Sequence, residues 1–301
     1  MAALSNRLVR FFRGEGPQAL TLPFPNGHFY SPVVDVGEVA NRQSQLWPEK
    51  RCARPGIDFN DSQQRAFLME VFPRYFADYD YPHQASPEDP HQFFTNNGRF
   101  EWLDSRTLFV MLRWIAPKKM IEVGSGYSSL LAADVNRRFF DEQIDLTCIE
   151  PFLPDFLRHG VPGISRLMPE KVQDMTLSTF EELDSGDILF IDSSHVSKTG
   201  SDVNYLILDV LPRLRPGVVI HFHDIFLPND YPKEWVLAQR RSWNEQYLVQ
   251  AMLTLTNGFE VLFGCAYAAH CMPDLVRGAL KGKFYGGGSL WIRRTDEFIG
   301  D

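Results

Sequence analysis

The chain has 301 residues, of which 44% are hydrophobic and 23% charged, so it can bury a large core and is too apolar to be disordered. Its formal net charge of -8 gives no general attraction to phosphate backbones or anionic lipid, which disfavours nucleic acid and membrane surfaces as partners. No stretch approaches the roughly 20 apolar residues that cross a bilayer.

Residues 1–97 are predicted to form an extension with a helical cap. The first residues suit a short amphipathic helix that docks either on the protein's own core or on a second subunit of a homo-oligomer. Its apolar side comprises Leu4, Leu8, Phe11 and Phe12. Residues 20–60 are rich in proline and turn formers, which indicates an irregular wrapping segment. Residues 62–75 have apolar positions at helical spacing, and prolines follow them.

From residue 98 to residue 301 the pattern changes to short apolar runs that alternate with helical segments. This is typical of βα units around a parallel sheet and predicts a doubly wound α/β domain. The strands are expected at 118–123, 145–150, 164–172, 187–192, 217–224, 259–263 and 289–294. The helices are expected at 103–116, 128–139, 176–183, 202–214 and 242–256. The last two strands are close enough in sequence to pair antiparallel.

The segment MIEVGSGYSS places a tight turn between a buried strand and a helix. Gly124 and Gly126 let the backbone approach a ligand, and the helix that follows offers free N–H groups. Ser129 stands where a dinucleotide-binding enzyme would have its third glycine. The acidic Glu122 beside the turn would repel a pyrophosphate but suits a cationic amino-acid group. A nicotinamide dehydrogenase is therefore disfavoured.

Two further acids follow the next two strands. Glu150 ends the second strand, where a carboxylate can accept hydrogen bonds from both hydroxyls of a ribose. Asp174 follows the third strand, and it either contacts an adenine ring or caps the helix that begins near Thr176.

From about residue 97 onward the chain resembles a class I S-adenosylmethionine-dependent methyltransferase, and within that class methyltransferase family 24. The resemblance lies in IEVGSGYSS, CIEP, ILFIDSSH and GVVIHFHDIFLPNDYP. It implies a Rossmann-like methyltransferase fold, a seven-stranded sheet with an antiparallel last strand. It also implies S-adenosylmethionine as cofactor. The cofactor-binding residues would be Glu122, Gly124, Ser125, Gly126, Tyr127, Ser128, Glu150, Asp174 and Asp192.

The tips of the fourth and fifth strands carry the remaining polar candidates: Asp192 and His195, then His221, His223 and Asp224. Both tips belong to the ligand-binding edge of an open parallel sheet. Related metal-dependent O-methyltransferases imply a divalent metal at the positions of Asp192, His223 and Asp224. His223 replaces a carboxylate there, which favours a transition metal over Mg²⁺. Alternatively, His221 and His223 face one side of a strand and only satisfy buried hydrogen bonds.

His195 is the candidate general base and Asp192 its catalytic partner. A hydroxyl that attacks the sulfonium methyl group must lose a proton, and histidine titrates near neutral pH. Its structural alternative is a loop residue that caps the helix near Asp202. The aromatic, proline-stiffened segments GHFYSP and FLPNDYPKEW suit a lid over an acceptor pocket. Tyr30, His221, Tyr231 and Trp235 are the candidate acceptor-binding residues, and the glycine run before the last strand is assigned no chemistry.

Cys52, Cys148, Cys265 and Cys271 lack the paired spacing of a zinc site, so they are interpreted as reduced thiols of a cytoplasmic protein. The resulting hypothesis is methylation of a small-molecule hydroxyl, on a sugar or a natural product, with or without a metal. Two alternatives keep the fold: a metal-dependent oxidative enzyme, and a non-catalytic cofactor-binding partner of another protein.

Overall fold

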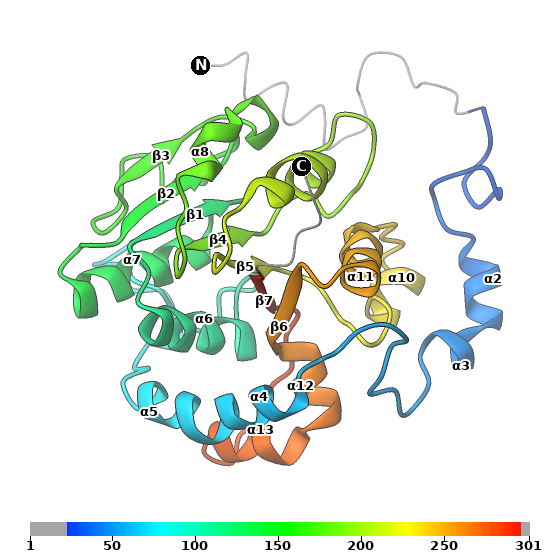
Figure 1. Ribbon diagram of the computed structural model, residues 1–301, viewed down its shortest axis with the longest axis horizontal. Coiled ribbons are helices and arrows are strands. Elements are labelled where there is room, and N and C mark those ends of the chain that lie inside the picture. The colour runs from blue at the N-terminus through cyan, green and yellow to red at the C-terminus, as the bar shows by residue number, and fades with distance from the viewer. Residues whose placement is uncertain (1–22, 296–301) are drawn as a thin grey trace.

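The computed structural model describes residues 23–295. The expected amphipathic helix around Leu4 to Phe12 lies outside these residues. One mixed sheet organises the described chain, in the order β3-β2-β1-β4-β5-β7-β6 (Figure 1). The seven strands are β1 (Lys119–Val123), β2 (Asp145–Ile149), β3 (Arg166–Met168), β4 (Ile188–Ile191), β5 (Val219–Phe222), β6 (Phe259–Gly264) and β7 (Leu290–Arg294).

The central strands pair in parallel, and β7 runs antiparallel to both of its neighbours, β5 and β6. The predicted doubly wound α/β sheet with an antiparallel last strand is therefore confirmed. Every residue of β4 and β5 is buried, because helices cover both faces of the sheet. This explains why the strands read as continuous apolar runs rather than as alternating ones.

The helices around the sheet match most of the predicted segments. They are α6 (Trp102–Ile115), α7 (Tyr127–Phe140), α8 (Leu177–Glu181), α9 (Asp202–Asn204) continued by turns to Arg213, and α11 (Glu245–Leu255). Five helices of the described chain were not predicted. They are α10 (Lys233–Leu237), α12 (Cys265–Cys271), α13 (Pro273–Ala279), and the pair α2 (Val36–Asn41) and α3 (Gln43–Leu46) inside the segment expected to be irregular.

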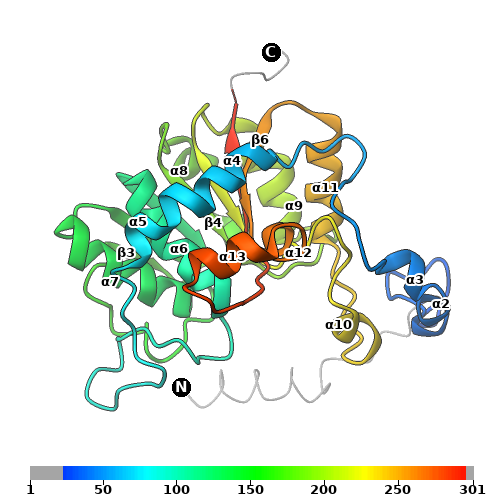
Figure 2. The same ribbon diagram turned by 90° about the horizontal axis from the view of Figure 1, so that it is seen from below.

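The predicted helical cap runs as α4 (Asp61–Ala66), a π-helical turn at Phe67–Val71, and α5 (Phe72–Phe76). Figure 2 shows this rod alongside α13, beneath the sheet. Phe67, Leu68 and Phe72 are buried in the same hydrophobic cluster as the strands. The cap therefore shares the core of the sheet, and the domain boundary at residue 98 stays a prediction.

A disulfide joins Cys52 to Cys271, 219 residues apart. The interpretation of all four cysteines as reduced thiols is wrong for this pair, while Cys148 and Cys265 are free and buried. No local spacing could have revealed the bridge, because only the fold brings the extension to α12. The cysteine argument for a cytoplasmic location is thereby removed. No helix between residues 23 and 295 is long and apolar enough to span a membrane.

Candidate active site

The turn after β1 has no room for a side chain at its first glycine. Gly124 has a φ of +85°, and a Cβ there would lie 1.7 Å from the backbone oxygen of Asp192. Only glycine avoids both the backbone strain and the collision. Gly126 has no such requirement, since nothing lies within 4 Å of a Cβ placed on it. The turn can therefore approach the tip of β4 this closely only because residue 124 is a glycine.

A cleft of about 510 Å³ opens at this turn. Among the predicted cofactor residues, its walls include Gly124, Ser125, Gly126, Tyr127, Ser128, Glu150 and Asp192. The prediction missed its other wall residues, which are Arg99, Phe100, Phe152, Pro154 and Phe156. These come from the segment before α6 and the loop after β2, neither of which has a motif that marks it.

The chemistry of the cleft fits S-adenosylmethionine. The Ser125 hydroxyl is buried in the wall without a hydrogen-bond partner, so it is free to meet a polar group of a ligand. Glu150 stands directly after β2, and its Oε1 accepts a 2.6 Å hydrogen bond from the Phe152 amide. Partial burial raises the pKa of Glu150 against the effect of that bond. The rings of Tyr127 and Phe156 stack at 5.0 Å and supply a flat apolar surface.

Two predicted cofactor residues lie apart from the walls of the cleft. Glu122 is fully buried behind the turn, where it accepts hydrogen bonds from the Ser128 hydroxyl at 2.5 Å and the Cys148 thiol at 3.4 Å. Burial raises its pKa to about 7, although these hydrogen bonds oppose the shift. Asp174 is exposed in a short 3-10 turn. Its alternative role as a helix cap is wrong, because Thr176 occupies the N-cap position of α8.

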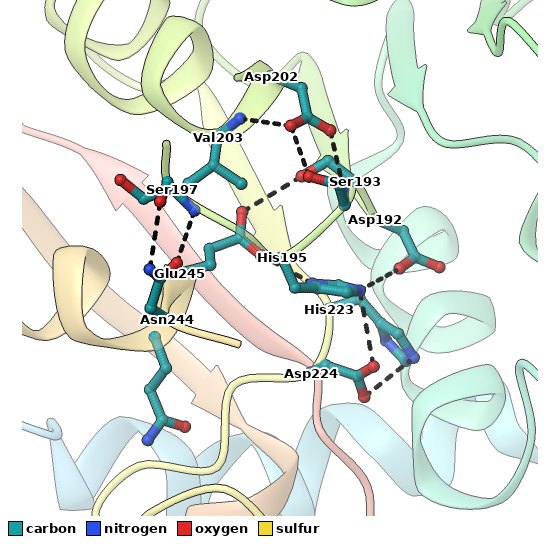
Figure 3. Close-up of polar contacts among 12 residues, drawn as sticks. Asp192, Ser193, His195, Ser197, Asp202, Val203, His223, Asp224, Asn244 and Glu245 are labelled. Carbon is teal, nitrogen blue, oxygen red and sulfur yellow. Dashed lines mark hydrogen bonds and ion pairs between the residues drawn. The ribbon is translucent and has the colours of Figure 1, made fainter. Parts of the chain in front are cut away.

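The predicted catalytic residues converge at the tips of β4 and β5 (Figure 3). His195 Nε2 lies 3.3 Å from Asp192 Oδ1 and 3.7 Å from Asp224 Oδ2. Its other nitrogen, Nδ1, lies 2.8 Å from Glu245 Oε2. The imidazole therefore joins three carboxylates from three segments of the chain. His195 does not cap the helix near Asp202, since the Ser201 hydroxyl performs that role.

These carboxylates change the protonation of the site. Burial alone would lower the pKa of His195, but its hydrogen bonds to Asp192 and Glu245 and their negative charges raise it to about 10. Burial would raise the pKa of Asp192, but the positive charges of His223 and His195 lower it instead. At neutral pH the resting site therefore holds an imidazolium beside an ionised carboxylate.

The predicted metal ligands do not form a preorganised metal site. His195 Nε2 lies between Asp192 and Asp224, 3.3 Å from Asp192 Oδ1 and 3.7 Å from Asp224 Oδ2. His223 Nε2 lies 3.6 Å from Asp224 Oδ1, and the negative charges of Asp192 and Asp224 raise its pKa despite its burial. Within residues 23–295, no group of three or more His, Cys, Asp or Glu side chains converges to hold a metal ion.

The predicted acceptor residues are scattered. His221 is fully buried between Phe190 and Trp291, and its Nε2 lies 2.9 Å from Ser289 Oγ, so an acceptor does not reach it. Its buried-histidine alternative describes it better. Tyr30 is 65% exposed.

The ring contacts of Tyr30 among the described residues are with its neighbours Phe24, His28 and Phe29, away from the cleft. Tyr231 and Trp235 are near each other, since both pack on the Phe226 ring. Trp235 also packs on Trp243, whose ring lies 4.4 Å from that of His195.

Two acids of the site were not predicted. Glu245 begins α11 and is 1% exposed, yet an acid at the first turn of a helix gives no sign of burial. Asp104, on α6, accepts hydrogen bonds from the amides of Gly288 at 3.1 Å and Ser289 at 2.7 Å. The glycine run to which no chemistry was assigned therefore passes through the site, between Asp104 and Asp224.

Comparison with known proteins agrees with this arrangement. A family model described as a methyltransferase domain matches residues 121–225, from β1 to just past the tip of β5. An uncharacterized protein of Archaeoglobus fulgidus is 36% identical over 177 residues, which are 58% of this chain and 80% of that protein.

Two solved structures are similar at a lower level. A putative O-methyltransferase from Klebsiella pneumoniae is 12% identical, with a TM-score of 0.37 over 86% of this chain and 96% of its own. The CmcI-N160 apo-structure is 14% identical, with a TM-score of 0.39 over 72% of this chain and 88% of its own. Both scores are too low to support a conclusion about this chain.

Proposed function

We propose that this chain is a class I S-adenosylmethionine-dependent methyltransferase that methylates a hydroxyl group of a small molecule such as a sugar or a natural product, since a methyltransferase-domain model matches residues 121–225. One observation carries the proposal. Asp192 lines the glycine cleft and also contacts His195 Nε2 at 3.3 Å. The cofactor cleft and a proton-handling histidine thus share one wall, as methyl transfer to a hydroxyl requires.

Each wall of the cleft suits one part of the cofactor. Arg99, a cation on the wall of the cleft, is placed to bind the methionine carboxylate, and Ser125 to bind a polar group beside it. Glu150 accepts the ribose hydroxyls, and the stacked Tyr127 and Phe156 rings border the adenine. When bound, S-adenosylmethionine supplies a methyl group activated by its sulfonium.

His195 and Glu245 handle the proton of the acceptor. Glu245 accepts from Nδ1 and so fixes the ring orientation, while Nε2 faces Asp192 and Asp224. In its neutral form His195 accepts the hydroxyl proton at Nε2, and the resulting imidazolium is stabilised by the carboxylates around it. Metal assistance is left out of the proposal, because the imidazole already bridges Asp192 and Asp224.

Calorimetry with S-adenosylmethionine and transfer of its labelled methyl group to a panel of small alcohols test the function. We expect Gly124→Ala to abolish binding, since the added Cβ collides with Asp192. His195→Ala should retain binding and lose about a hundredfold or more in turnover. Glu150→Gln should weaken binding, because Glu150 accepts the ribose hydroxyls. Asp174→Asn is its matched control and should leave binding unchanged, because Asp174 is an acid outside the cleft.

Wild-type protein that binds no S-adenosylmethionine would refute the proposal. A chelator should leave transfer unchanged. Loss of turnover on chelation, restored by one metal, would instead support the metal-dependent alternative.

A further inference from the structure

Arg241 lies in the loop between α10 and α11 and is held by two indole rings. Its Cζ lies 4.1 Å from the centre of the Trp235 ring and 4.6 Å from that of Trp243. Among the residues that the structure describes, no carboxylate lies within 4.0 Å of its guanidinium nitrogens. Stacking covers the faces of a guanidinium and leaves its N–H edge free to bind.

Arg106 also lies against two aromatic rings, those of Tyr79 and Tyr285, but its guanidinium donates to the Trp102 carbonyl. Most arginines of the sheet and its helices meet acids, as Arg137 does with Asp134 at 3.0 Å and Arg166 with Asp145 at 3.0 Å. Among the described residues, Arg241, like Arg99 on the wall of the glycine cleft, borders a cavity without forming an ion pair. Its N–H edge is therefore available to an anion from outside the chain.

Arg241 lines a cavity of about 250 Å³ between the N-terminal extension and this loop. Trp47, Tyr231, Trp243 and Tyr247 form much of its apolar wall. The wall of the cavity also includes Asp230, one of whose carboxylate oxygens is hydrogen-bonded within the chain. Its Oδ1 accepts hydrogen bonds from the Tyr231 amide at 2.9 Å and the Tyr247 hydroxyl at 2.7 Å.

The cavity is close to the catalytic histidine. The Trp243 ring packs on Arg241 and also lies 4.4 Å from the His195 ring. The next residue, Asn244, lines the cavity and donates its backbone N–H to the His195 carbonyl at 3.0 Å. A ligand held at Arg241 is therefore separated from His195 by a single indole ring.

We propose that Arg241 binds an anionic group, a carboxylate or a phosphate, carried by the acceptor. The inference rests on the proposed methyl transfer for the identity of the ligand, but the anion site itself does not depend on that reaction. It refines the acceptor to a hydroxylated acid or phosphate ester.

Tryptophan fluorescence tests the anion site directly, because two of the six tryptophans flank the guanidinium. Succinate and inorganic phosphate are titrated separately at constant ionic strength, which decides between the two anion types. We expect saturable quenching by one or both probes in the wild type and in Arg240→Gln, an exposed neighbouring arginine. Arg241→Gln should weaken binding at least about tenfold, the equivalent of one charged hydrogen bond.

Arg241→Lys, which keeps the charge and loses the planar fork, should bind with intermediate strength. Its circular dichroism and that of Arg241→Gln are compared with wild type to check the fold. Quenching of equal strength in wild type and Arg241→Gln would overturn the site, as would the absence of quenching by either probe.

Methyl transfer separates this inference from the proposed function. Hydroxy acids and their neutral amides are offered with labelled S-adenosylmethionine. We expect the acids to be preferred, and Arg241→Gln to raise their KM with little change in kcat. If wild type and Arg241→Gln methylate the hydroxy acids with the same KM, the methyltransferase proposal stands and Arg241 does not bind the acceptor. If nothing is methylated but quenching still depends on Arg241, the anion site stands and the reaction is wrong.

Discussion

His195 is held at both ring nitrogens by carboxylates and has a φ of 59°, a backbone region that non-glycine residues rarely adopt. Such strain persists only where surrounding contacts fix the residue. Here the His195 carbonyl accepts hydrogen bonds from the amides of Asn244 and Glu245. The start of α11 thus fixes both the backbone and the side chain of the proposed base.

Glu245→Gln tests this arrangement through the pH dependence of turnover. Because the neutral form of His195 is the base, kcat/KM should rise with pH toward its pKa of about 10. Removing the Glu245 charge lowers that pKa, so the rising limb moves to lower pH. The ring also loses its fixed orientation, and kcat should fall about tenfold to a hundredfold. If the rising limb of the kcat/KM profile lies at the same pH in Glu245→Gln and in wild type, Glu245 does not act on His195.

Glu122 predicts a pH dependence of stability with the opposite sign from most carboxylates. Its pKa is raised from 4.5 in the unfolded chain to about 7 in the folded one. The folded state therefore binds the extra proton, and ionisation destabilises it as the pH rises from 4.5 to 7. Glu122→Gln has no carboxylate to ionise and so avoids this penalty. Its free energy of unfolding, measured relative to that of wild type, should therefore be about 3 kcal/mol higher above pH 7 than below pH 4.5.

Urea unfolding of the wild type and Glu122→Gln at pH 5 and pH 8 measures this difference. Circular dichroism is a suitable probe, since the site lies in the sheet. A constant difference between the two proteins across these pH values would contradict the prediction.

The glycine run before β7 positions a carboxylate of the site. A Cβ on Gly288 would lie 3.0 Å from Asp224 Cα and 3.1 Å from Asp224 Oδ1. Gly288→Ala should therefore displace Asp224 and reduce turnover by a factor on the order of ten to a hundred, while cofactor binding stays unchanged. Gly286→Ala is the matched control, because nothing lies within 4 Å of a Cβ there. Equal turnover in both variants would show that the run acts only as a connection.

The strands were predictable because each is a short apolar run bounded by turn residues, and their tips gave Asp192, His195 and Asp224. Glu245 was not predictable, since its burial depends on where α11 docks rather than on its neighbours in sequence. The spacing of apolar residues shows which helix or strand a residue belongs to. It does not show which other helix or strand packs against that element. For the same reason Arg99 and the Asp104 contact with the glycine run required the folded structure.

At the scale of the whole molecule, the disulfide and two hydrogen bonds tie residues 47–54 of the N-terminal extension to the loop after β5 and to α12. Trp47 Nε1 donates to the Tyr231 carbonyl at 2.8 Å, and Arg54 Nε donates to the Pro228 carbonyl at 2.6 Å. The Cys52–Cys271 disulfide adds a covalent link between the extension and the end of α12. The extension thereby contacts the segment from the loop after β5 to α11, which contains Trp235 in α10 and Trp243 in the loop that follows.

Reduction of the disulfide should lower the stability of the wild type by about 2 to 4 kcal/mol, because it frees a long closed loop in the unfolded chain. The measurement is the thermal midpoint with and without a thiol reductant. The double variant Cys52→Ser with Cys271→Ser should be less stable at the outset and insensitive to the reductant. An identical midpoint in oxidised and reduced wild type would contradict the bridge.

The position of β7 in the sheet has a consequence for synthesis. β6 is translated before β7 but joins the sheet only through it, and β5 keeps an open edge until β7 arrives. A nascent chain therefore exposes an unpaired apolar strand edge until residues 290–294 have left the ribosome. Because Gly288, just before β7, packs on Asp224, the proposed site at the tips of β4 and β5 is complete only once β7 has been translated.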